Sequence, residues 1–225
     1  KIRLAIAQLN PTVGDLGGNA RKISNWIRLA ERQKADLIVF PECALAGYPV
    51  WDLANKQGFI DQELKILEHI VRSTQGKKVT VVLGFIDRGN RPGGRSRNSM
   101  IWFQGGRSIA KQHKRLLPTY DVFLEDIFFE PGVESQTVKW GGWRVGPTIC
   151  EDIWDEAYRE KPLADLARRG ANLVVNISAS PYYRGVAEAR DPQGISPATP
   201  AATATAKAIR DRDRFSMGAR ISRRP

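Results

Sequence analysis

Apolar residues along the first part of the chain recur with strand or helix spacing, and this pattern predicts alternating strands and helices. Residues 2–7 alternate with the two-residue period of a strand. Apolar positions from 23 to 30 fall on one helix face, and Asn19 is placed to cap that helix. The predicted elements that follow are a strand at 37–40 stopped by Pro41, a helix at 61–73 and a strand at 79–86.

The pattern continues with a hairpin and a second set of strands. Gly105 and Gly106 separate strand-like stretches at 98–103 and 108–112, which is typical of a β-hairpin. The remaining predicted elements are a strand at 143–149 ending at Cys150, a helix around 163–167 stopped by Gly170, and a strand at 173–177. A hairpin among crossover helices favours a layered α/β sandwich over a plain doubly wound parallel sheet.

The last part of the chain has a different composition. Residues 196–206 consist of alanine, threonine, proline and one serine, and residues 210–214 alternate arginine and aspartate. Such a stretch lacks the large apolar residues needed for a core. We therefore predict one domain at 1–185 and a low-complexity tail at 186–225, disordered or locally helical around 205–214.

The overall composition is that of a globular protein and excludes several classes. With 225 residues the chain is long enough for one domain with a large core, and no apolar run approaches the ~20 residues of a membrane helix. Cys43 and Cys150 form neither a disulfide framework nor a metal-ligand pattern, and no export signal is visible, so we expect reduced thiols in the cytoplasm. The net charge of +11 is spread without aromatic interleaving, so neither nucleic acid nor a membrane is an expected partner.

Three residues at predicted strand ends carry the chemistry that the sequence suggests. Cys150 ends one apolar strand, Glu42 follows another after Pro41, and Lys114 follows the hairpin. A thiol needs a base or a nearby cation to become a nucleophile, and an ammonium can stabilise an oxyanion. Taken alone, each residue more often serves in packing, at a turn or on a solvated surface. The combination of the three suggests covalent catalysis on a C–N bond.

The neighbours of these residues resemble a known family. The segments 40–49 (FPECALAGYP), 114–125 (KRLLPTYDVFLE) and 150–154 (CEDIW) are similar to the glutamate, lysine and cysteine segments of the nitrilase superfamily of carbon–nitrogen hydrolases. Within it they look most like the glutaminase domains of glutamine-dependent NAD synthetases. The resemblance covers about residues 2–185.

The resemblance implies a fold, a reaction and a set of site residues. The fold would be an αββα sandwich, incomplete at its C-terminal end and self-associating as a homo-oligomer. Glutamine would be hydrolysed through a Cys thioester, with ammonia passed on to amidate deamido-NAD. That hydrolysis needs no cofactor, whereas ATP and Mg belong to the synthetase domain of the family. The implied catalytic residues are Glu42, Lys114 and Cys150, and the implied glutamine contacts are Tyr48, Tyr120, Glu125, Trp154 and Ser180.

Departures from the family pattern leave alternatives open. No segment resembles the pyrophosphate loop of the synthetase domain, so we expect this chain alone not to make NAD. Val186 stands where the family usually has a cation for the substrate carboxylate, and Arg184 is a possible replacement. A frameshift or truncation near 186–192 would explain the tail. The alternatives are a stand-alone amidase or nitrilase acting on another amide, and a catalytically dead truncated remnant.

Overall fold

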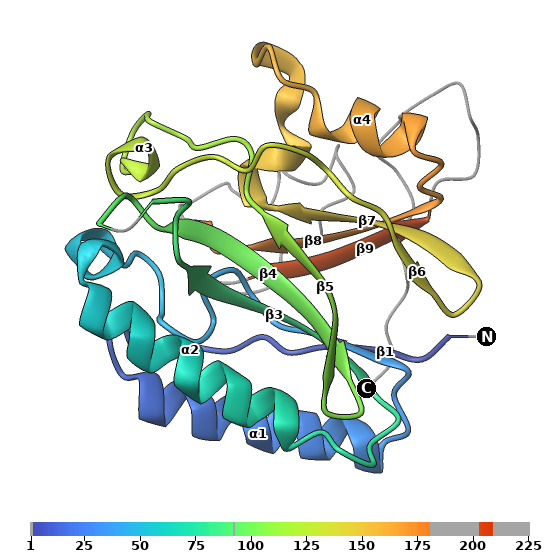
Figure 1. The fold of residues 1–225 in the computed structure, drawn as a ribbon. Helices are drawn as coiled ribbons and strands as arrows, with labels where there is room; N and C mark the ends of the chain where they lie inside the picture. Colours follow the sequence, from blue (N-terminus) through green and yellow to red (C-terminus); the bar gives the residue numbers. More distant parts are fainter. Residues whose placement is uncertain (1, 92, 181–202, 209–225) are drawn as a thin grey trace.

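The computed structural model describes residues 2–91, 93–180 and 203–208 and arranges them around two β-sheets (Figure 1). The five-stranded sheet has the order β1 (Leu4–Ile6), β2 (Leu37–Val39), β3 (Thr80–Asp87), β4 (Arg97–Gln104) and β5 (Arg107–His113). The four-stranded sheet has the order β6 (Val138–Trp140), β7 (Trp143–Ile149), β8 (Leu173–Ser178) and β9 (Thr203–Ala208). β1, β2 and β3 are parallel, as are β7 and β8, and all other neighbours are antiparallel.

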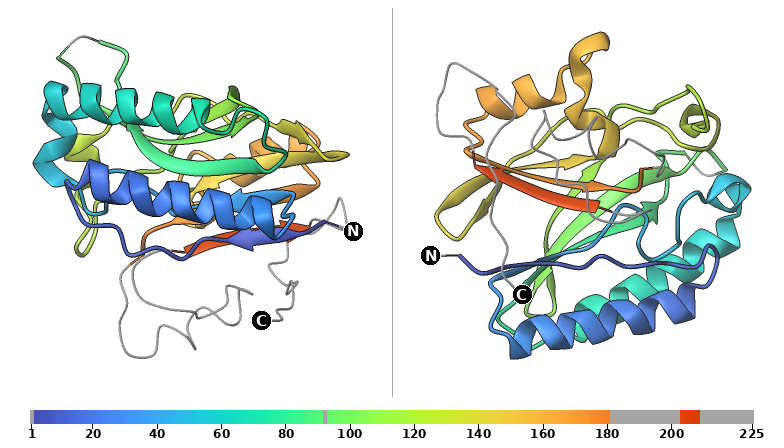
Figure 2. Two further views of the ribbon diagram at one scale, coloured as in Figure 1. Left: turned by 90° about the horizontal axis from the view of Figure 1, so that it is seen from below. Right: turned by 180° about the vertical axis from the view of Figure 1, so that it is seen from behind.

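Helices cover the outer face of each sheet and complete four layers. The helices α1 (Leu16–Arg32) and α2 (Gln57–Arg72) lie side by side on the five-stranded sheet, and α4 (Pro162–Arg168) packs on β7 at the opposite side of the molecule (Figures 1 and 2). The short elements are η1 (Trp51–Asn55), α3 (Glu125–Phe128), η2 (Cys150–Ile153) and η3 (Asp155–Ala157). The predicted αββα sandwich is therefore confirmed.

The central strands of the five-stranded sheet, β2, β3 and β4, are apolar on both faces because each face contacts a different core. Val81, Leu83 and Phe85 of β3 point toward α1 and α2, whereas Val82 between them points into the core shared with β7 and β8. Side chains alternate between the faces of a strand, so a strand buried on both sides reads as a continuous apolar run. This is why the hydrophobic pattern located the central strands.

The first helix begins earlier than predicted, and Asn19 does not cap it. Asp15 is the cap, accepting the Gly18 backbone N–H at 2.8 Å. Asn19 lies inside α1, fully buried, where its amide exchanges hydrogen bonds with the Thr12 backbone and donates to the Leu45 carbonyl at 2.9 Å. An asparagine suits a cap because its amide binds backbone groups. Here the amide of Asn19 binds the backbone of Thr12 and of Leu45 and so connects two loops.

Two strands of the second sheet were not predicted. β6 is only three residues long, and β9 falls within the stretch expected to be disordered or helical. The prediction of a helix is wrong for residues 205–208, which pair antiparallel with β8. Alternating threonine suits a strand, and the pairing covers an otherwise open edge of β8. The proposed domain boundary at 185 and the rest of the tail lie outside the described residues.

No helix in the described part of the chain combines the length and the apolar character that crossing a membrane requires.

Candidate active site

Glu42 follows the carboxyl end of β2 and is held rigidly in the interior. Its side chain has no exposed surface. β3 passes so close to this turn that a Cβ at Gly84 would lie 2.3 Å from the Pro41 carbonyl oxygen. Glu42 Oε1 accepts a hydrogen bond from Asn98 Nδ2 at 2.7 Å, and Oε2 accepts one from the Ala179 backbone N–H at 2.8 Å. The carboxylate is therefore fixed from both sheets.

Lys114 leaves the end of β5 and points between two carboxylates. Its backbone N–H donates to the Asn98 carbonyl at 2.8 Å. Its Nζ lies 2.8 Å from Glu42 Oε1 and 2.7 Å from Glu125 Oε2, with no side-chain surface exposed. Burial alone would lower the pKa of Lys114, but the charges of Glu125 and Glu42 raise it above its ordinary value. Lys114 is therefore a permanent cation at this site.

Cys150 stands where β7 ends and η2 begins, with a φ of 46° in the left-handed region. Such backbone conformations are uncommon outside glycine and concentrate at functional turns. Its Sγ lies 3.9 Å from Ser180 Oγ, and the side chain is buried. Burial and then the charge of Glu42 raise the pKa of the thiol to about 12, against the opposing charge of Lys114. The resting thiol is therefore protonated and needs a base before it can attack.

Asp152 ties the cysteine turn to the lysine segment. Its Oδ2 accepts the backbone N–H of Ile149 at 3.0 Å, just before Cys150. Its Oδ1 accepts the backbone N–H groups of the two residues after Lys114, each at 2.9 Å. Burial raises the pKa of Asp152 to about 6 although these bonds oppose the change. One buried carboxylate thus fixes the separation of the two segments.

Glu125, at the start of α3, extends the charged cluster. Its Oε1 accepts a hydrogen bond from the Tyr48 hydroxyl at 2.9 Å, and its Oε2 pairs with Lys114. Burial raises the pKa of Glu125 to about 7, with Lys114 opposing and Glu42 reinforcing the change. Burial also raises the pKa of Tyr48, which keeps its proton and donates. Both oxygens of Glu125 are thus engaged within the protein.

The remaining predicted contacts surround the cysteine turn. The Tyr120 hydroxyl donates to Glu151, directly after Cys150, at 3.0 Å, and the Tyr158 hydroxyl donates to the same carboxylate at 2.8 Å. Glu151 is buried, whereas Tyr120 is 53% exposed. Trp154 stands at the end of η2 and is half-buried. Tyr120 and its neighbours therefore form a rim beside the buried cluster.

The structure brings together most of the residues that the sequence singled out. Hydrogen bonds and ion pairs connect Glu42, Lys114, Glu125 and Tyr48. Cys150 lies beside Ser180, and the preceding residue, Ala179, donates its backbone N–H to Glu42. Sequence reasoning missed Asn98, Glu151 and Asp152. Glu151 and Asp152 directly follow Cys150 in its motif segment, and this position was a sequence signal for them. Asn98 is a single polar residue within a predicted strand, and nothing in the sequence points to it.

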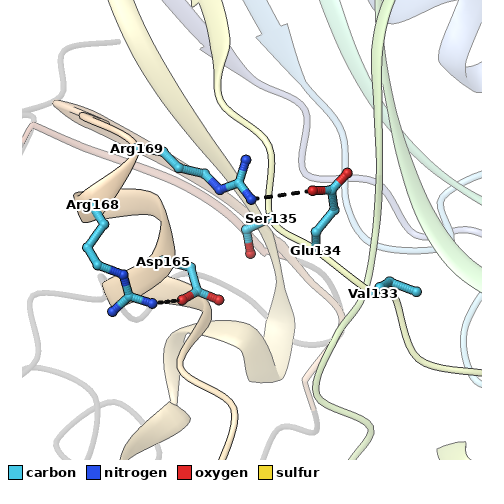
Figure 3. Close-up of a pocket in the computed structure, with 6 residues that line it drawn as sticks. All are labelled: Val133, Glu134, Ser135, Asp165, Arg168 and Arg169. Carbon is cyan, nitrogen blue, oxygen red and sulfur yellow. Dashed lines mark hydrogen bonds and ion pairs between the residues drawn. The ribbon is translucent and has the colours of Figure 1, made fainter.

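A separate cavity of about 440 Å³ lies between α4 and the segment around residue 134 (Figure 3). Its two arginines are already paired, Arg169 with Glu134 and Arg168 with Asp165. None of its lining residues belongs to the buried cluster of Glu42, Lys114, Glu125, Tyr48 and Cys150. In the described ranges no group of three histidine, cysteine, aspartate or glutamate side chains is arranged to hold a metal ion.

An αββα sandwich whose strand ends bring a buried cysteine, glutamate and lysine together defines a class of hydrolase. The family model for carbon-nitrogen hydrolases matches residues 3–210, and the chain belongs to this enzyme family. It is 40% identical over 186 residues to the glutamine-dependent NAD(+) synthetase of Thermotoga maritima, covering 82% of this chain and 31% of that protein. With the Synechocystis synthetase it shares 39% over 193 residues, covering 81% of this chain and 34% of that protein.

Solved structures of two proteins have the same fold as this chain. A glutamine-dependent NAD+ synthetase from Acinetobacter baumannii superposes with a TM-score of 0.76 at 27% identity, covering 85% of this chain and 35% of that one. An amidase from Nesterenkonia sp. AN1 shares the fold with a TM-score of 0.68 at 22% identity, covering 82% of this chain and 70% of that one. The chain thus spans about a third of the length of the synthetases that it matches.

Proposed function

We propose that this chain hydrolyses the side-chain amide of glutamine through a thioester on Cys150. The observation that carries the proposal is the position of Lys114, held between Glu42 and Glu125 in the buried cluster, where its charge and that of Glu42 both act on the Cys150 thiol. A buried protonated thiol with a carboxylate base and a fixed cation is suited to acyl transfer. Similarity to glutamine-dependent synthetases supports glutamine as the substrate.

The proposed reaction uses each catalytic residue in turn. Glu42 takes the thiol proton while Cys150 Sγ bonds to the amide carbon, and Lys114 stabilises the oxyanion that forms. The C–N bond then breaks, and Glu42 returns the proton to the departing ammonia. In the second half, Glu42 takes a proton from water, whose oxygen attacks the thioester carbon. Glutamate leaves, and the proton returns to the thiol.

The remaining site residues are proposed to bind glutamine or to support the catalytic groups. Tyr48, Tyr120, Trp154 and Ser180 are the proposed substrate contacts. Glu125 was expected to contact glutamine, but its oxygens already meet Lys114 and Tyr48. We therefore propose that its main role is to hold Lys114 in place. Arg184, the candidate partner of the substrate carboxylate, lies outside the described residues.

The ammonia has a proposed destination. The relatives are named glutamine-dependent NAD(+) synthetases, and two thirds of their length lies outside the matched part. We propose that ammonia from Cys150 supports amidation of deamido-NAD in the cytoplasm by such a synthetase part, which would use ATP and Mg. Homo-oligomer formation is proposed from the family resemblance alone.

Ammonia release from glutamine by the purified chain tests the proposal. We expect turnover in the wild type and none above background in Cys150→Ala, with both proteins unfolding cooperatively in urea. Simple aliphatic amides such as propionamide serve as competing substrates. Soluble, folded wild type that releases no ammonia from glutamine would overturn the proposal, and release only from the simple amide would assign a stand-alone amidase instead.

A further inference from the structure

We propose that Asn98 is a positioning residue that leaves Oε2 of Glu42 as the atom that accepts the thiol proton. Asn98 lies on β4 and is 1% exposed. The inference rests on the proposed function only for the role of Glu42 as base. It does not depend on which amide is hydrolysed.

The two oxygens of Glu42 have unequal numbers of partners. Oε1 accepts one hydrogen bond from Asn98 Nδ2 at 2.7 Å and a second from Lys114 Nζ at 2.8 Å. Oε2 accepts the Ala179 N–H at 2.8 Å. A carboxylate oxygen offers about two lone-pair sites. Oε1 is therefore saturated by these two donors, and Oε2 keeps a site for the proton.

The orientation of the Asn98 amide has its own support. Cys43, next to Glu42, places Sγ 3.7 Å from Asn98 Oδ1, so the thiol donates to the amide oxygen. Burial raises the pKa of the Cys43 thiol, which keeps the proton needed for that bond. A flipped amide would instead set Oδ1 against the Glu42 carboxylate, where two acceptors repel. The second cysteine thus helps Asn98 present its N–H to the base.

Asn98 also acts through its backbone on the second catalytic side chain. Its carbonyl accepts the Lys114 N–H at 2.8 Å, while its side chain holds Glu42. The next residue on β4, Ser99, points the other way and meets His113 Nδ1 at 2.8 Å. One position on β4 therefore fixes both the base and the cation, whereas its neighbour does neither.

Removing the Asn98 amide leaves Oε1 with Lys114 as its one donor. Both oxygens then have a free site, and the proton is shared between a productive and an unproductive atom. General-base catalysis contributes about 10²–10⁴-fold in rate, so losing part of this alignment should reduce kcat by about 10- to 100-fold. A residue that acts only by positioning Glu42 leaves substrate binding unchanged, so KM should change by less than about threefold.

Two substitutions of Asn98 and a neighbouring control test this role. Asn98→Ala removes the donor, and Asn98→Asp keeps the shape but sets a second carboxylate against Glu42. Ser99→Ala alters a buried polar residue on the opposite face of β4 and should stay within about twofold of wild type. Each protein is alkylated with iodoacetamide across pH, with mass spectrometry separating the Cys150 product from that of Cys43, and assayed for amide hydrolysis.

We expect slower alkylation of Cys150 in both Asn98 variants, with its onset moved to higher pH, and the larger effect in Asn98→Asp. A misplaced base no longer takes the thiol proton, so alkylation then depends on hydroxide removing a proton that burial holds on Cys150. Unfolding in urea identifies any variant that is misfolded, and the isosteric Asn98→Asp keeps the test readable if Asn98→Ala does not fold.

Two outcomes would overturn the inference. One is a folded Asn98→Asp whose alkylation and kcat stay within about twofold of wild type. The other is a general loss of rate with an unchanged pH dependence, which would make Asn98 a packing residue only. A wild type that is alkylated faster than the Asn98 variants but releases no ammonia from glutamine would refute the proposed substrate and leave this role standing.

Discussion

Replacing Glu63 with glutamine should stabilise the protein at high pH and change little at low pH. Glu63 lies on α2, fully buried beneath β3, where Oε1 accepts the Ile86 N–H at 3.2 Å. Its Oε2 has no hydrogen-bond partner among the described residues. Burial raises the pKa of Glu63 from 4.5 to about 8, with Asp87 adding to the effect and the Ile86 N–H opposing it. Glutamine keeps the shape and the acceptor of the protonated acid but cannot ionise.

The sign and the size of the effect follow from proton linkage. The folded state holds the Glu63 proton more tightly than the unfolded state, so its contribution to stability is lost as pH rises from about 4.5 to about 8. One pKa unit corresponds to about 1.4 kcal/mol. Glu63→Gln should therefore raise the free energy of unfolding by about 3 kcal/mol at pH 7 and about 5 kcal/mol at pH 8.5. At pH 5 the difference should shrink to about 1 kcal/mol.

Urea denaturation of both proteins between pH 5 and pH 9 measures this difference. Glu68→Gln is the matched control, because Glu68 lies on the same helix with its side chain 61% exposed. Its effect should stay within about 0.5 kcal/mol at every pH. A Glu63→Gln difference that does not grow with pH would refute the reasoning, because it would show that the pKa of Glu63 is the same in the folded and the unfolded protein.

Three further substitutions test how the site is built. Gly84→Ala should abolish ammonia release and lower the free energy of unfolding, because its Cβ would lie 2.3 Å from a backbone oxygen. In the control Gly58→Ala the added Cβ meets nothing within 4 Å, so both quantities should stay unchanged. Asn19→Ala should reduce the free energy of unfolding, measured by urea denaturation, by about 1–3 kcal/mol, because three backbone groups lose their partner. The control Asn25→Ala changes an exposed residue of the same helix and should stay within about 0.5 kcal/mol, and equal effects of the two substitutions would contradict this reasoning. Lys114→Met should lower kcat by at least about 100-fold and the free energy of unfolding by about 3–5 kcal/mol, because two buried carboxylates lose their cation. A folded variant with near-normal kcat would show that Lys114 takes no part in the reaction.

The sequence by itself determined the central strands, the hairpin and the two long helices. Their signals are local: β3 and β7 are apolar on both faces because each lies between two layers, and Gly105-Gly106 allows the tight turn between β4 and β5. The three motif segments also identified the family, because the residues of each motif follow one another along the chain.

Only the tertiary structure decided how these groups act on one another. Glu42, Lys114 and Cys150 are far apart in sequence, yet Lys114 pairs with Glu42 and both charges act on the Cys150 thiol, because the three residues follow the ends of β2, β5 and β7. Asn98 gives no sequence signal, since its importance arises from a hydrogen bond 56 residues away along the chain.

The engagement of Glu125 and the β9 pairing are non-local in the same way. Glu125 was expected to meet the substrate and instead contacts Lys114 and Tyr48, while β9 pairs with an edge formed elsewhere in the chain. Residue patterns report periodicity along the chain. Hydrogen bonds, charges and open strand edges act across space, so their partners are fixed only when the fold has brought distant segments together.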